Sequence, residues 1–470
     1  MEKIIGRERE FELLDNFKSS GKAEFIALFG RRRVGKTFLV RQYFEDKFDF
    51  YATGIIDGNR EEEMSAFFSA LRTHGYSGAR PKTWIDMFDV LASLLAKKKR
   101  RNGRIVVFID ELPCFDTQHS GFTHALDYFW NGKASWMDNM MFVVCGSATS
   151  WMIRNIVNNK GGLHNRITHS IHLRPFTLKQ VELYAKNHKT CWTRMDILQM
   201  FMTTGGIPYY LSKIDFNDSV ANNIDRLFFG NEAEMKDEYN RLFSSLYKNP
   251  NGYMEIIRLL CEHKKGLTRN EISEKLNIPT SGNLTRMLDD LQYCDFIRMY
   301  NNGTKHNGGI YQVIDFYTVF HNAFCKKPST DKHFWSNKIG SPQISTFYGL
   351  AYERVCMCHI DQILSAMHLD RIHTEYYSWR STSTEPSAQI DLIIDRADGI
   401  ISICEIKFSR NEYSLQKDEY NKIIHRAETF MSETKQRKGF QITIITTYGT
   451  KTNMYSEISA NNVVLDDLFY

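Results

Sequence analysis

The sequence predicts an α/β fold in three parts: a parallel-sheet domain, a helical lid with a winged helix-turn-helix, and a second α/β domain. A strand, a glycine-rich loop and a helix follow one another at 25–44 and indicate the first part. Three helices and two strands over 253–314 indicate the second, and an α-β-β-β-α-β order over 347–447 indicates the third. The expected bounds are 1–210 for the first domain, 211–252 for the lid or linker, 253–325 for the winged helix and 326–470 for the last domain.

Length and composition are those of an ordinary globular chain with about two to four domains. The formal net charge of +5 neither requires nor excludes a nucleic-acid partner. The nine cysteines form no C-x-x-C pair, which predicts free thiols in a reducing cytoplasm. No apolar run approaches the length of a membrane span, and the first residues lack the apolar core of a secretory leader. We therefore expect a cytoplasmic protein without a membrane partner.

The stretch 25–37 predicts a nucleotide triphosphate site. Its apolar run ends at a G-x-x-x-x-G-K-T motif, and apolar residues at helical spacing follow. Gly30 and Gly35 permit backbone shapes that turn N–H groups towards phosphate oxygens at a helix N-terminus. Lys36 can reach the outer phosphates, and the Thr37 hydroxyl can bind Mg²⁺. The residues expected to bind nucleotide are Gly30, Arg31, Arg32, Arg33, Val34, Gly35, Lys36 and Thr37.

A second apolar strand pattern, 105–109, ends in two acids. At the carboxyl edge of a parallel sheet, Asp110 can hold Mg²⁺ together with the loop, and Glu111 can polarise the attacking water. A further strand at 141–146 ends at Ser147, a polar group suited to sensing the γ-phosphate. Arg166 follows at the distance of an arginine finger, and the sequence favours this role and that of a surface arginine equally.

This set of motifs resembles the archaeal-type ATPases of the AAA+/STAND group. The resemblance is carried by the arginine-rich phosphate loop, the Asp110-Glu111 pair, Cys145-Gly146-Ser147 and the Gly-Gly-Ile-Pro turn at 205–208. It covers the first half of the chain and implies a P-loop fold of the ASCE type that binds ATP and Mg²⁺. In this family Glu111 would be catalytic, Ser147 would be sensor 1, and Arg7 would lie near the base. Whether the chain forms a homo-oligomer, and whether a partner protein triggers its activity, both stay open at this point.

The order of elements over 253–325 is typical of a winged helix-turn-helix. Thr268 and Glu271 form a capping box before the second helix, and a Gly/Asn-rich wing joins the strands at 296–300 and 310–314. Residues 253–300 contain seven basic and seven acidic side chains, whereas a major-groove reader usually has a basic face. DNA contact and a packing role are therefore equally compatible with this region.

The last domain carries a second group of charged residues. Glu405 and Lys407 share one face of a strand, because side-chain direction repeats every second residue. If Asp391 on the neighbouring strand projects to that side, the three groups suit metal-dependent phosphodiester hydrolysis. The spacing resembles the PD-(D/E)xK restriction-endonuclease-like superfamily, with Ile390 where many members have proline. The resemblance implies Mg²⁺ ligands at Glu353, Asp391 and Glu405, and catalytic roles for Asp391, Glu405 and Lys407.

Two functions follow from these patterns. The first is an ATPase whose nucleotide state controls a Mg²⁺-dependent DNA nuclease in the same chain. The second is a nucleotide-dependent switch or DNA-binding protein whose nuclease-like domain is catalytically silent. The first would fail if Asp391 and Glu405 faced different sides of their sheet.

Overall fold

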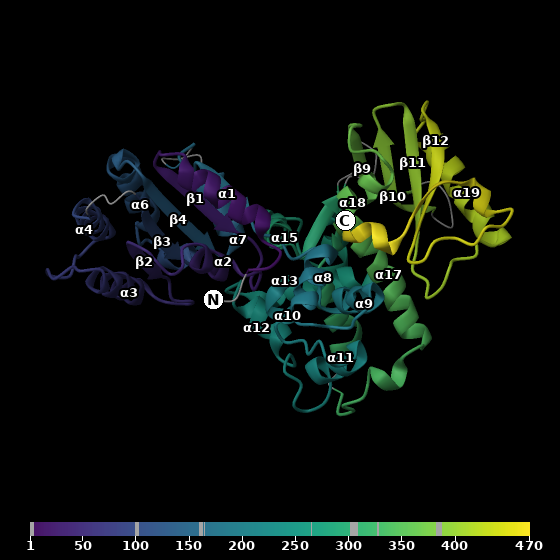
Figure 1. Ribbon diagram of the computed structural model, residues 1–470, viewed down its shortest axis with the longest axis horizontal. Coiled ribbons are helices and arrows are strands. Elements are labelled where there is room, and N and C mark those ends of the chain that lie inside the picture. The colour runs from purple at the N-terminus through teal and green to yellow at the C-terminus, as the bar shows by residue number, and fades with distance from the viewer. Residues whose placement is uncertain are drawn as a thin grey trace.

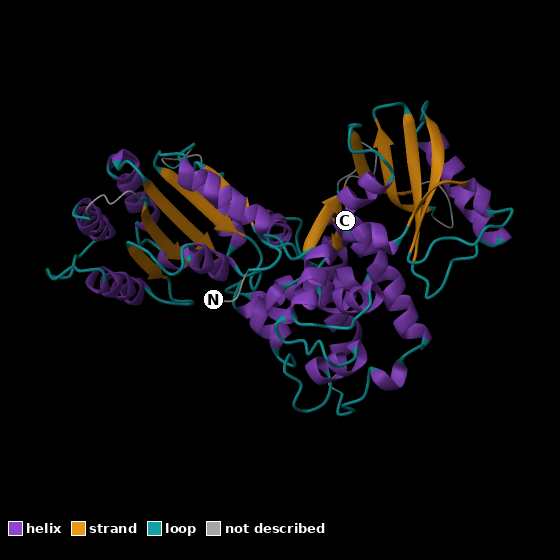
Figure 2. Ribbon diagram, in the orientation of Figure 1, coloured by secondary structure: helices purple, strands orange, loops and turns teal. Residues whose placement is uncertain are grey.

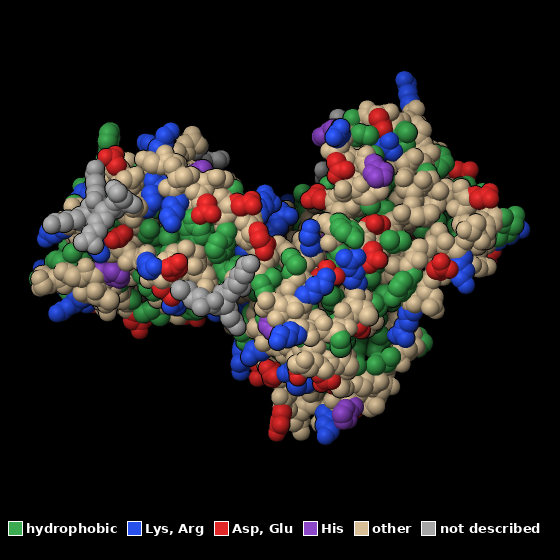
Figure 3. Space-filling model, in the orientation of Figure 1, with side chains coloured by type: hydrophobic (Ala, Val, Ile, Leu, Met, Phe, Trp, Pro, Cys, Tyr) green, Lys and Arg blue, Asp and Glu red, His purple; other side chains and the backbone are tan. Residues whose placement is uncertain are grey.

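The computed structural model describes residues 4–98, 103–158, 163, 165–264, 266–300, 309–326, 329–381 and 388–470. Two sheet units lie on either side of a helical centre (Figures 1 and 2). The expected wing falls largely on residues 301–308, outside the described part of the chain. No described helix has the length and hydropathy that crossing a bilayer requires. Figure 3 shows acidic and basic side chains interspersed over the displayed face.

The first unit contains strands β1 (Glu24–Phe29), β2 (Phe50–Thr53), β3 (Ile105–Asp110), β4 (Met140–Gly146) and β5 (His169–His172). They form one parallel sheet in the order β2-β3-β4-β1-β5. Its helices are α1 (Glu8–Ser19), α2 (Lys36–Tyr43), α3 (Arg60–Thr73), α4 (Trp84–Ala96), α5 (Leu112–Phe115), α6 (Phe122–Gly132) and α7 (Thr149–Met152). Helices α1 and α2 cover one face, and α3, α4 and α6 cover the other. Burial on both faces explains why the central strands are continuous apolar runs.

The helical centre consists of α8 (Leu178–Asn187), α9 (Arg194–Thr204), α10 (Pro208–Leu211), α11 (Val220–Phe228), α12 (Glu238–Ser244) and α13 (Pro250–Glu262). The chain continues through β6 (Leu267–Thr268), α14 (Arg269–Leu276), α15 (Gly282–Tyr293), β7 (Ile297–Tyr300), β8 (Ile310–Val313) and α16 (Phe316–Phe320). The three strands form an antiparallel sheet in the order β6-β8-β7. The predicted capping box of Thr268 and Glu271 is present at the start of α14.

The last unit contains α17 (Pro342–Cys358), α18 (Ile360–Ala366), β9 (Thr374–Arg380), β10 (Gln389–Arg396), β11 (Ile400–Lys407), α19 (Lys417–Glu433), β12 (Gly439–Thr446) and β13 (Ser459–Val463). The sheet order is β13-β12-β11-β10-β9, with β10 antiparallel to both neighbours and β11, β12 and β13 parallel. Helix α17 packs on one face and α19 on the other. The sheet is therefore mixed, and its β9–β11 portion is a meander.

Helix α17 also joins the last unit to the rest of the chain. His359, at its C-terminus, accepts a hydrogen bond from the backbone N–H of Leu178 at the start of α8 (3.0 Å). Arg354 donates through Nε to the carbonyl oxygen of Val313 in β8 (3.1 Å). These contacts anchor one helix to two different parts of the molecule.

Candidate functional site

The phosphate loop joins β1 to α2, in the strand–loop–helix order that the sequence predicts. Gly30 and Gly35 have φ angles of 147° and 90°, and a Cβ at Gly30 would lie 2.3 Å from the carbonyl oxygen of Leu173. The Lys36 Nζ donates to the carbonyl oxygens of Gly30 (2.9 Å) and Arg31 (3.0 Å). The ammonium therefore lies inside the loop, where the motif predicts phosphate binding.

Asp110 lies buried at the end of β3, beside the loop. Thr37 Oγ1 donates to Asp110 Oδ2 (2.8 Å), and Cys145 Sγ donates to Asp110 Oδ1 (2.6 Å). Burial raises the pKa of Asp110 above its ordinary value. A hydroxyl and a desolvated carboxylate in contact are oxygen ligands that a hard cation would stabilise. These two residues therefore fit the predicted Mg²⁺ ligands.

Glu111 and Ser147 lie together at the same edge of the sheet. The Ser147 backbone N–H donates to Glu111 Oε2 (2.9 Å), and its hydroxyl donates to Oε1 (2.7 Å). The φ angle of Glu111 is 46°, in the left-handed region that is uncommon for residues other than glycine. Such conformations cluster at functional positions, where the surrounding structure holds them. The predicted water-polarising acid and the predicted phosphate sensor are thus in contact.

The three arginines of the loop extend in different directions. Arg31 forms a buried ion pair with Asp315, just before α16, and Arg33 forms one with Glu238 of α12. Arg32 is partly exposed. The side chains of Arg31 and Arg33 are therefore engaged by the later part of the chain, and only their backbone groups remain within the loop. Nothing local in the sequence signals these acids, because 284 positions separate Asp315 from Arg31.

Arg7 supports the loop from the side of α1. Its Nη2 donates to the carbonyl oxygen of Val34 (3.0 Å), and its guanidinium lies 4.6 Å from the centre of the Phe176 ring. Burial lowers the pKa of Arg7 to about 10. Arg7 thus contacts the phosphate loop, and its place near the base stays a prediction.

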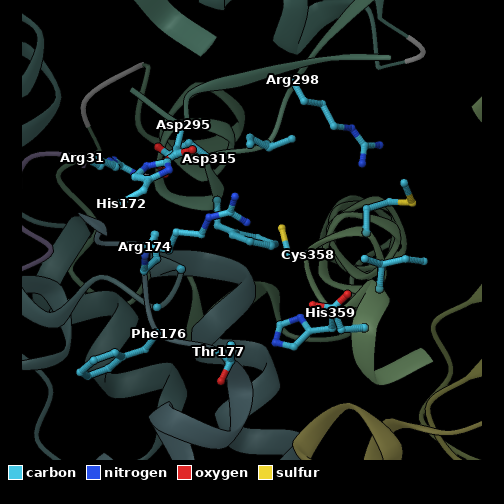
Figure 4. Close-up of a pocket in the computed structure, with 18 of the residues that line it drawn as sticks. Arg31, His172, Arg174, Phe176, Thr177, Asp295, Arg298, Asp315, Cys358 and His359 are labelled. Carbon is cyan, nitrogen blue, oxygen red and sulfur yellow. The ribbon is translucent and has the colours of Figure 1, made fainter. Parts of the chain in front are cut away.

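A cavity of about 1780 Å³ opens beside the phosphate loop, lined by the first unit, β7 and the last sheet. Figure 4 shows Arg174 and Arg298 among the side chains that line it. The lining includes Arg31 but neither Lys36 nor Thr37. The cavity therefore adjoins the phosphate site and does not contain it.

Arg166 does not join the nucleotide site of its own chain. It is exposed and precedes β5, and Thr168 pairs with the carbonyl of Phe25 near the amino end of β1. The phosphate loop begins at the carboxyl end of β1, and β1 and β5 run parallel. Arg166 therefore lies at the opposite edge of the sheet, and an arginine finger at this position would have to act on a neighbouring copy.

Asp391 and Glu405 lie near each other on the neighbouring strands β10 and β11. The antiparallel register of these strands ends at the pair Leu392–Cys404, which are the residues next to Asp391 and Glu405, and β10 has a bulge against β9 between Ile390 and Ile393. Burial and the charge of Glu405 raise the pKa of Asp391, and Lys407 shares the face of Glu405 on β11. Lys407 Nζ lies 3.0 Å from Glu405 Oε1. Glu405 and Lys407 are thus in contact and Asp391 lies close to Glu405, and a joint catalytic role of the three stays a prediction.

Glu353 of α17 adds a third carboxylate to this group. Burial and the nearby charges of Asp391 and Glu405 raise the pKa of Glu353. Burial and the charge of Glu405 raise the pKa of Asp391 in the same way. A divalent cation would remove this repulsion, so the residue types fit the predicted metal ligands. We call Glu353, Asp391, Glu405 and Lys407 the acidic cluster.

Arg426 of α19 also contacts the acidic cluster, and sequence reasoning missed it. Its Nη1 lies 2.9 Å from Glu405 Oε2, so cations engage both oxygens of Glu405. Within the described residues, no group of three or more His, Cys, Asp and Glu side chains is arranged to hold a metal ion, so Glu353, Asp391 and Glu405 fit the predicted ligands by residue type and not by their present arrangement. The sequence signal that could have indicated Arg426 is helical spacing. Arg426 lies two turns after Glu419 and therefore on the same face of α19, and Glu419 is 3.9 Å from Lys407 of the acidic cluster.

The comparisons with known proteins match a family in the first part of the chain and relatives over a longer stretch. Residues 4–214 match the family described as an ATPase domain predominantly from Archaea. An uncharacterised protein of Methanocaldococcus jannaschii is 24% identical over an alignment of 331 residues that covers 68% of this chain and 68% of that protein. An uncharacterised ATP-binding protein of that organism is 44% identical over 44 residues, which are 9% of this chain and 75% of that protein.

Solved structures that are similar in part include a Walker-type ATPase and a branch migration motor. The Walker-type ATPase of Pyrococcus abyssi is 18% identical, with a TM-score of 0.48, over 68% of this chain and 96% of that chain. The RuvB Holliday junction branch migration motor of Thermotoga maritima is 14% identical, with a TM-score of 0.34, over 65% and 92%. From the family match and the phosphate-loop geometry, residues 4–214 form an ATPase domain of the archaeal type.

Proposed function

We propose that the chain hydrolyses ATP with Mg²⁺ in the phosphate-loop site, and that its nucleotide state controls a Mg²⁺-dependent DNA nuclease formed by the last domain. The first half of this proposal is supported by the archaeal-type ATPase domain. The second half rests on one observation, the proximity of Asp391, Glu405 and Lys407 on the neighbouring strands β10 and β11. The order of the last eight elements agrees with a restriction-endonuclease-like fold, and that of α13 to β8 with a winged helix.

In the proposed ATP hydrolysis, the loop N–H groups and Lys36 bind the phosphates, and Thr37 and Asp110 hold Mg²⁺. Bound Mg²⁺ supplies positive charge against the charge that develops on the phosphoryl oxygens. Glu111 orients and polarises the attacking water once nucleotide binding draws Ser147 towards the γ-phosphate. The Ser147 contact thereby keeps Glu111 in place until a triphosphate binds.

In the proposed nuclease, Asp391 and Glu405 hold Mg²⁺ with support from Glu353. The metal supplies Lewis acidity at the scissile phosphate. Lys407 orients the attacking water and stabilises charge on the phosphate. DNA is the proposed substrate, and the nearby β6–β8 region is a candidate to bind it, although its charge is balanced.

A second candidate function is favoured by the ion pairs of Glu405. Because Lys407 and Arg426 both engage this carboxylate, the last domain is also compatible with a catalytically silent role. The chain would then be a nucleotide-dependent switch that uses its later domains only for binding.

DNA cleavage with Mg²⁺ or Mn²⁺ distinguishes the two functions. The nuclease predicts cleavage by the wild type and a loss of about 100-fold or more in Glu405→Ala and Lys407→Ala, with ATP turnover unchanged. Asp395→Ala is the matched control, because Asp395 lies on the same strand as Asp391 and pairs with Lys438 (2.5 Å) outside the acidic cluster. ATP turnover without cleavage of single- or double-stranded DNA would favour the switch.

A further inference from the structure

Two acids from the later part of the chain hold the phosphate loop. The first is Asp315, which pairs with Arg31, and the two side chains are only 3% and 2% exposed. The carboxylate of Asp315 also caps α16, because its Oδ2 accepts from the backbone N–H of Thr318 (2.9 Å). On the other side, the Arg31 guanidinium lies 4.9 Å from the centre of the Phe296 ring. Arg31 is thus enclosed by the region that runs from β7 to α16.

The second acid is Glu238, which pairs with Arg33 and is 7% exposed. Its Oε1 also accepts a hydrogen bond from the hydroxyl of Tyr210 (2.9 Å). The Arg33 guanidinium lies 4.3 Å from the centre of the Tyr209 ring. The Gly-Gly-Ile-Pro-Tyr-Tyr turn and α12 therefore enclose the second arginine.

We propose that Asp315 and Glu238 are positioning residues of the nucleotide site, which prepare the phosphate loop for nucleotide and couple nucleotide binding to docking of the downstream region. This inference rests on the proposed ATP site and adds the regulation of that site. It gives the arginine-rich loop a role that phosphate binding alone does not explain.

The coupling follows from how the loop is held. The φ angle of Arg33 is 75°, a left-handed conformation that a non-glycine residue keeps only where its surroundings hold it. Arg31 contacts Lys36 through its carbonyl oxygen and Asp315 through its side chain, so one residue touches both the phosphate-binding lysine and the downstream region. Ordering the loop before binding lowers the entropy cost of binding nucleotide. By reciprocity, bound nucleotide must strengthen the docking that orders the loop.

Equilibrium binding of ATP and ADP to the full chain tests this proposal. Asp315→Asn and Glu238→Gln should each weaken binding by about tenfold. In an Arg31→Met background, Asp315→Asn should not weaken nucleotide binding further, because both substitutions remove the same Arg31–Asp315 ion pair. In the wild type, nucleotide should slow amide hydrogen exchange in α16, and in Asp315→Asn this slowing should be lost.

Asp290→Asn is the matched control. Asp290 is a buried acid in the downstream region that pairs with Arg154 of the first unit (2.9 Å), and Arg154 lies outside the phosphate loop. It should change nucleotide affinity by less than about threefold. If Asp315→Asn does not fold, Arg31→Lys serves instead, because it keeps the charge but loses the guanidinium geometry.

The outcomes separate this inference from the proposed function. If the wild type does not bind ATP, the proposed site itself is wrong. If the wild type binds ATP and Lys36→Ala does not, the proposed nucleotide site is supported. If Asp315→Asn and Glu238→Gln then bind ATP with wild-type affinity, only the positioning role of Asp315 and Glu238 is overturned. A loss of affinity no larger than that of Asp290→Asn overturns it as well.

Discussion

At the scale of single residues, the acids of the nucleotide site have side-chain partners from other elements. Asp110 has Thr37 and Cys145, and Glu111 has Ser147, within hydrogen-bond distance. Both acids lie at the carboxyl edge of the sheet, where parallel strands bring together residues that are distant in the sequence. One substitution in this site tests hydrolysis, and one at His359, outside the site, tests stability.

Replacing Glu111 by Gln should slow ATP turnover by about 100-fold or more while ATP still binds, because the amide keeps the shape of the side chain but cannot act as a base. Single-turnover hydrolysis and equilibrium binding measure the two effects separately. Lys36→Ala is the contrasting variant and should lose binding itself. Fast turnover in Glu111→Gln would remove this residue from its assigned role.

Replacing His359 by Gln should flatten the dependence of stability on pH. Burial lowers the pKa of His359 to about 4, whereas an unfolded imidazole titrates near about 6.5. Unfolding therefore takes up a proton between these values, so the stability contribution is complete above about pH 6.5 and falls by about 3 kcal/mol as the pH drops towards 4. Gln keeps an acceptor for the Leu178 N–H but does not titrate.

Urea unfolding between pH 4.5 and 7 measures this effect. The half-buried His321, whose pKa desolvation also lowers to about 4, acts in the same direction, so the variant should flatten the profile only in part. An unchanged slope in His359→Gln would contradict the assignment.

At the scale of elements, close backbone approach matters as much as helix and strand propensity. The turn between α9 and α10 lies against Phe176, whose N–H donates to the carbonyl oxygen of Gly206 (2.6 Å). A Cβ at Gly206 would lie 1.9 Å from the Phe176 carbonyl oxygen. Only glycine allows this approach, which joins the turn to the start of α8.

Gly206→Ala should therefore lower the free energy of unfolding by about 1–3 kcal/mol, as overpacking does elsewhere. Gly349 is the matched control, because it lies inside α17 with no atom within 4 Å of an added Cβ. Gly349→Ala should raise the free energy of unfolding by up to about 1 kcal/mol. Denaturant unfolding compares the two, and equal effects would show that the contact with Phe176 has no energetic importance.

At the scale of the whole molecule, contacts of the described residues connect all three units. Arg31 joins the phosphate loop to α16, and Arg354 of α17 donates to the carbonyl of Val313 in β8. A movement of the β7–α16 region can therefore reach both the nucleotide site and the last sheet. This geometry is the physical basis for proposing nucleotide control of the acidic cluster.

The rate of DNA cleavage should accordingly change by about fivefold or more between nucleotide-free and ATP-bound protein, the size of an ordinary coupling free energy. The Lys36→Ala variant should cleave DNA at the same rate with and without ATP, because it does not bind the nucleotide. Cleavage assays with and without ATP measure this difference. Cleavage by the wild type at a single rate under both conditions would separate the two sites.

The elements with strong local signals could be predicted from the sequence. The phosphate loop has its motif between an apolar strand and a helix, and Thr268 and Glu271 form their capping box three residues apart. The end of the first domain has no such local signal, because the apolar faces of α8 and α9 meet helices that come later in the chain. Arg166 has the sequence distance of an arginine finger, and strand direction places it at the edge of the sheet opposite the phosphate loop, where only a neighbouring copy could use it.

By itself, the sequence determined the phosphate-loop chemistry and the pairing of Glu405 with Lys407, because both depend on residues only a few positions apart. Only the tertiary structure decided that Asp391 lies close to Glu405, that Arg426 engages the carboxylate of Glu405, and that Asp315 and Glu238 pair with arginines of the phosphate loop. The physical reason is distance along the chain. An ion pair between residues hundreds of positions apart leaves no periodicity in the sequence, since it exists only after folding has brought the two elements together.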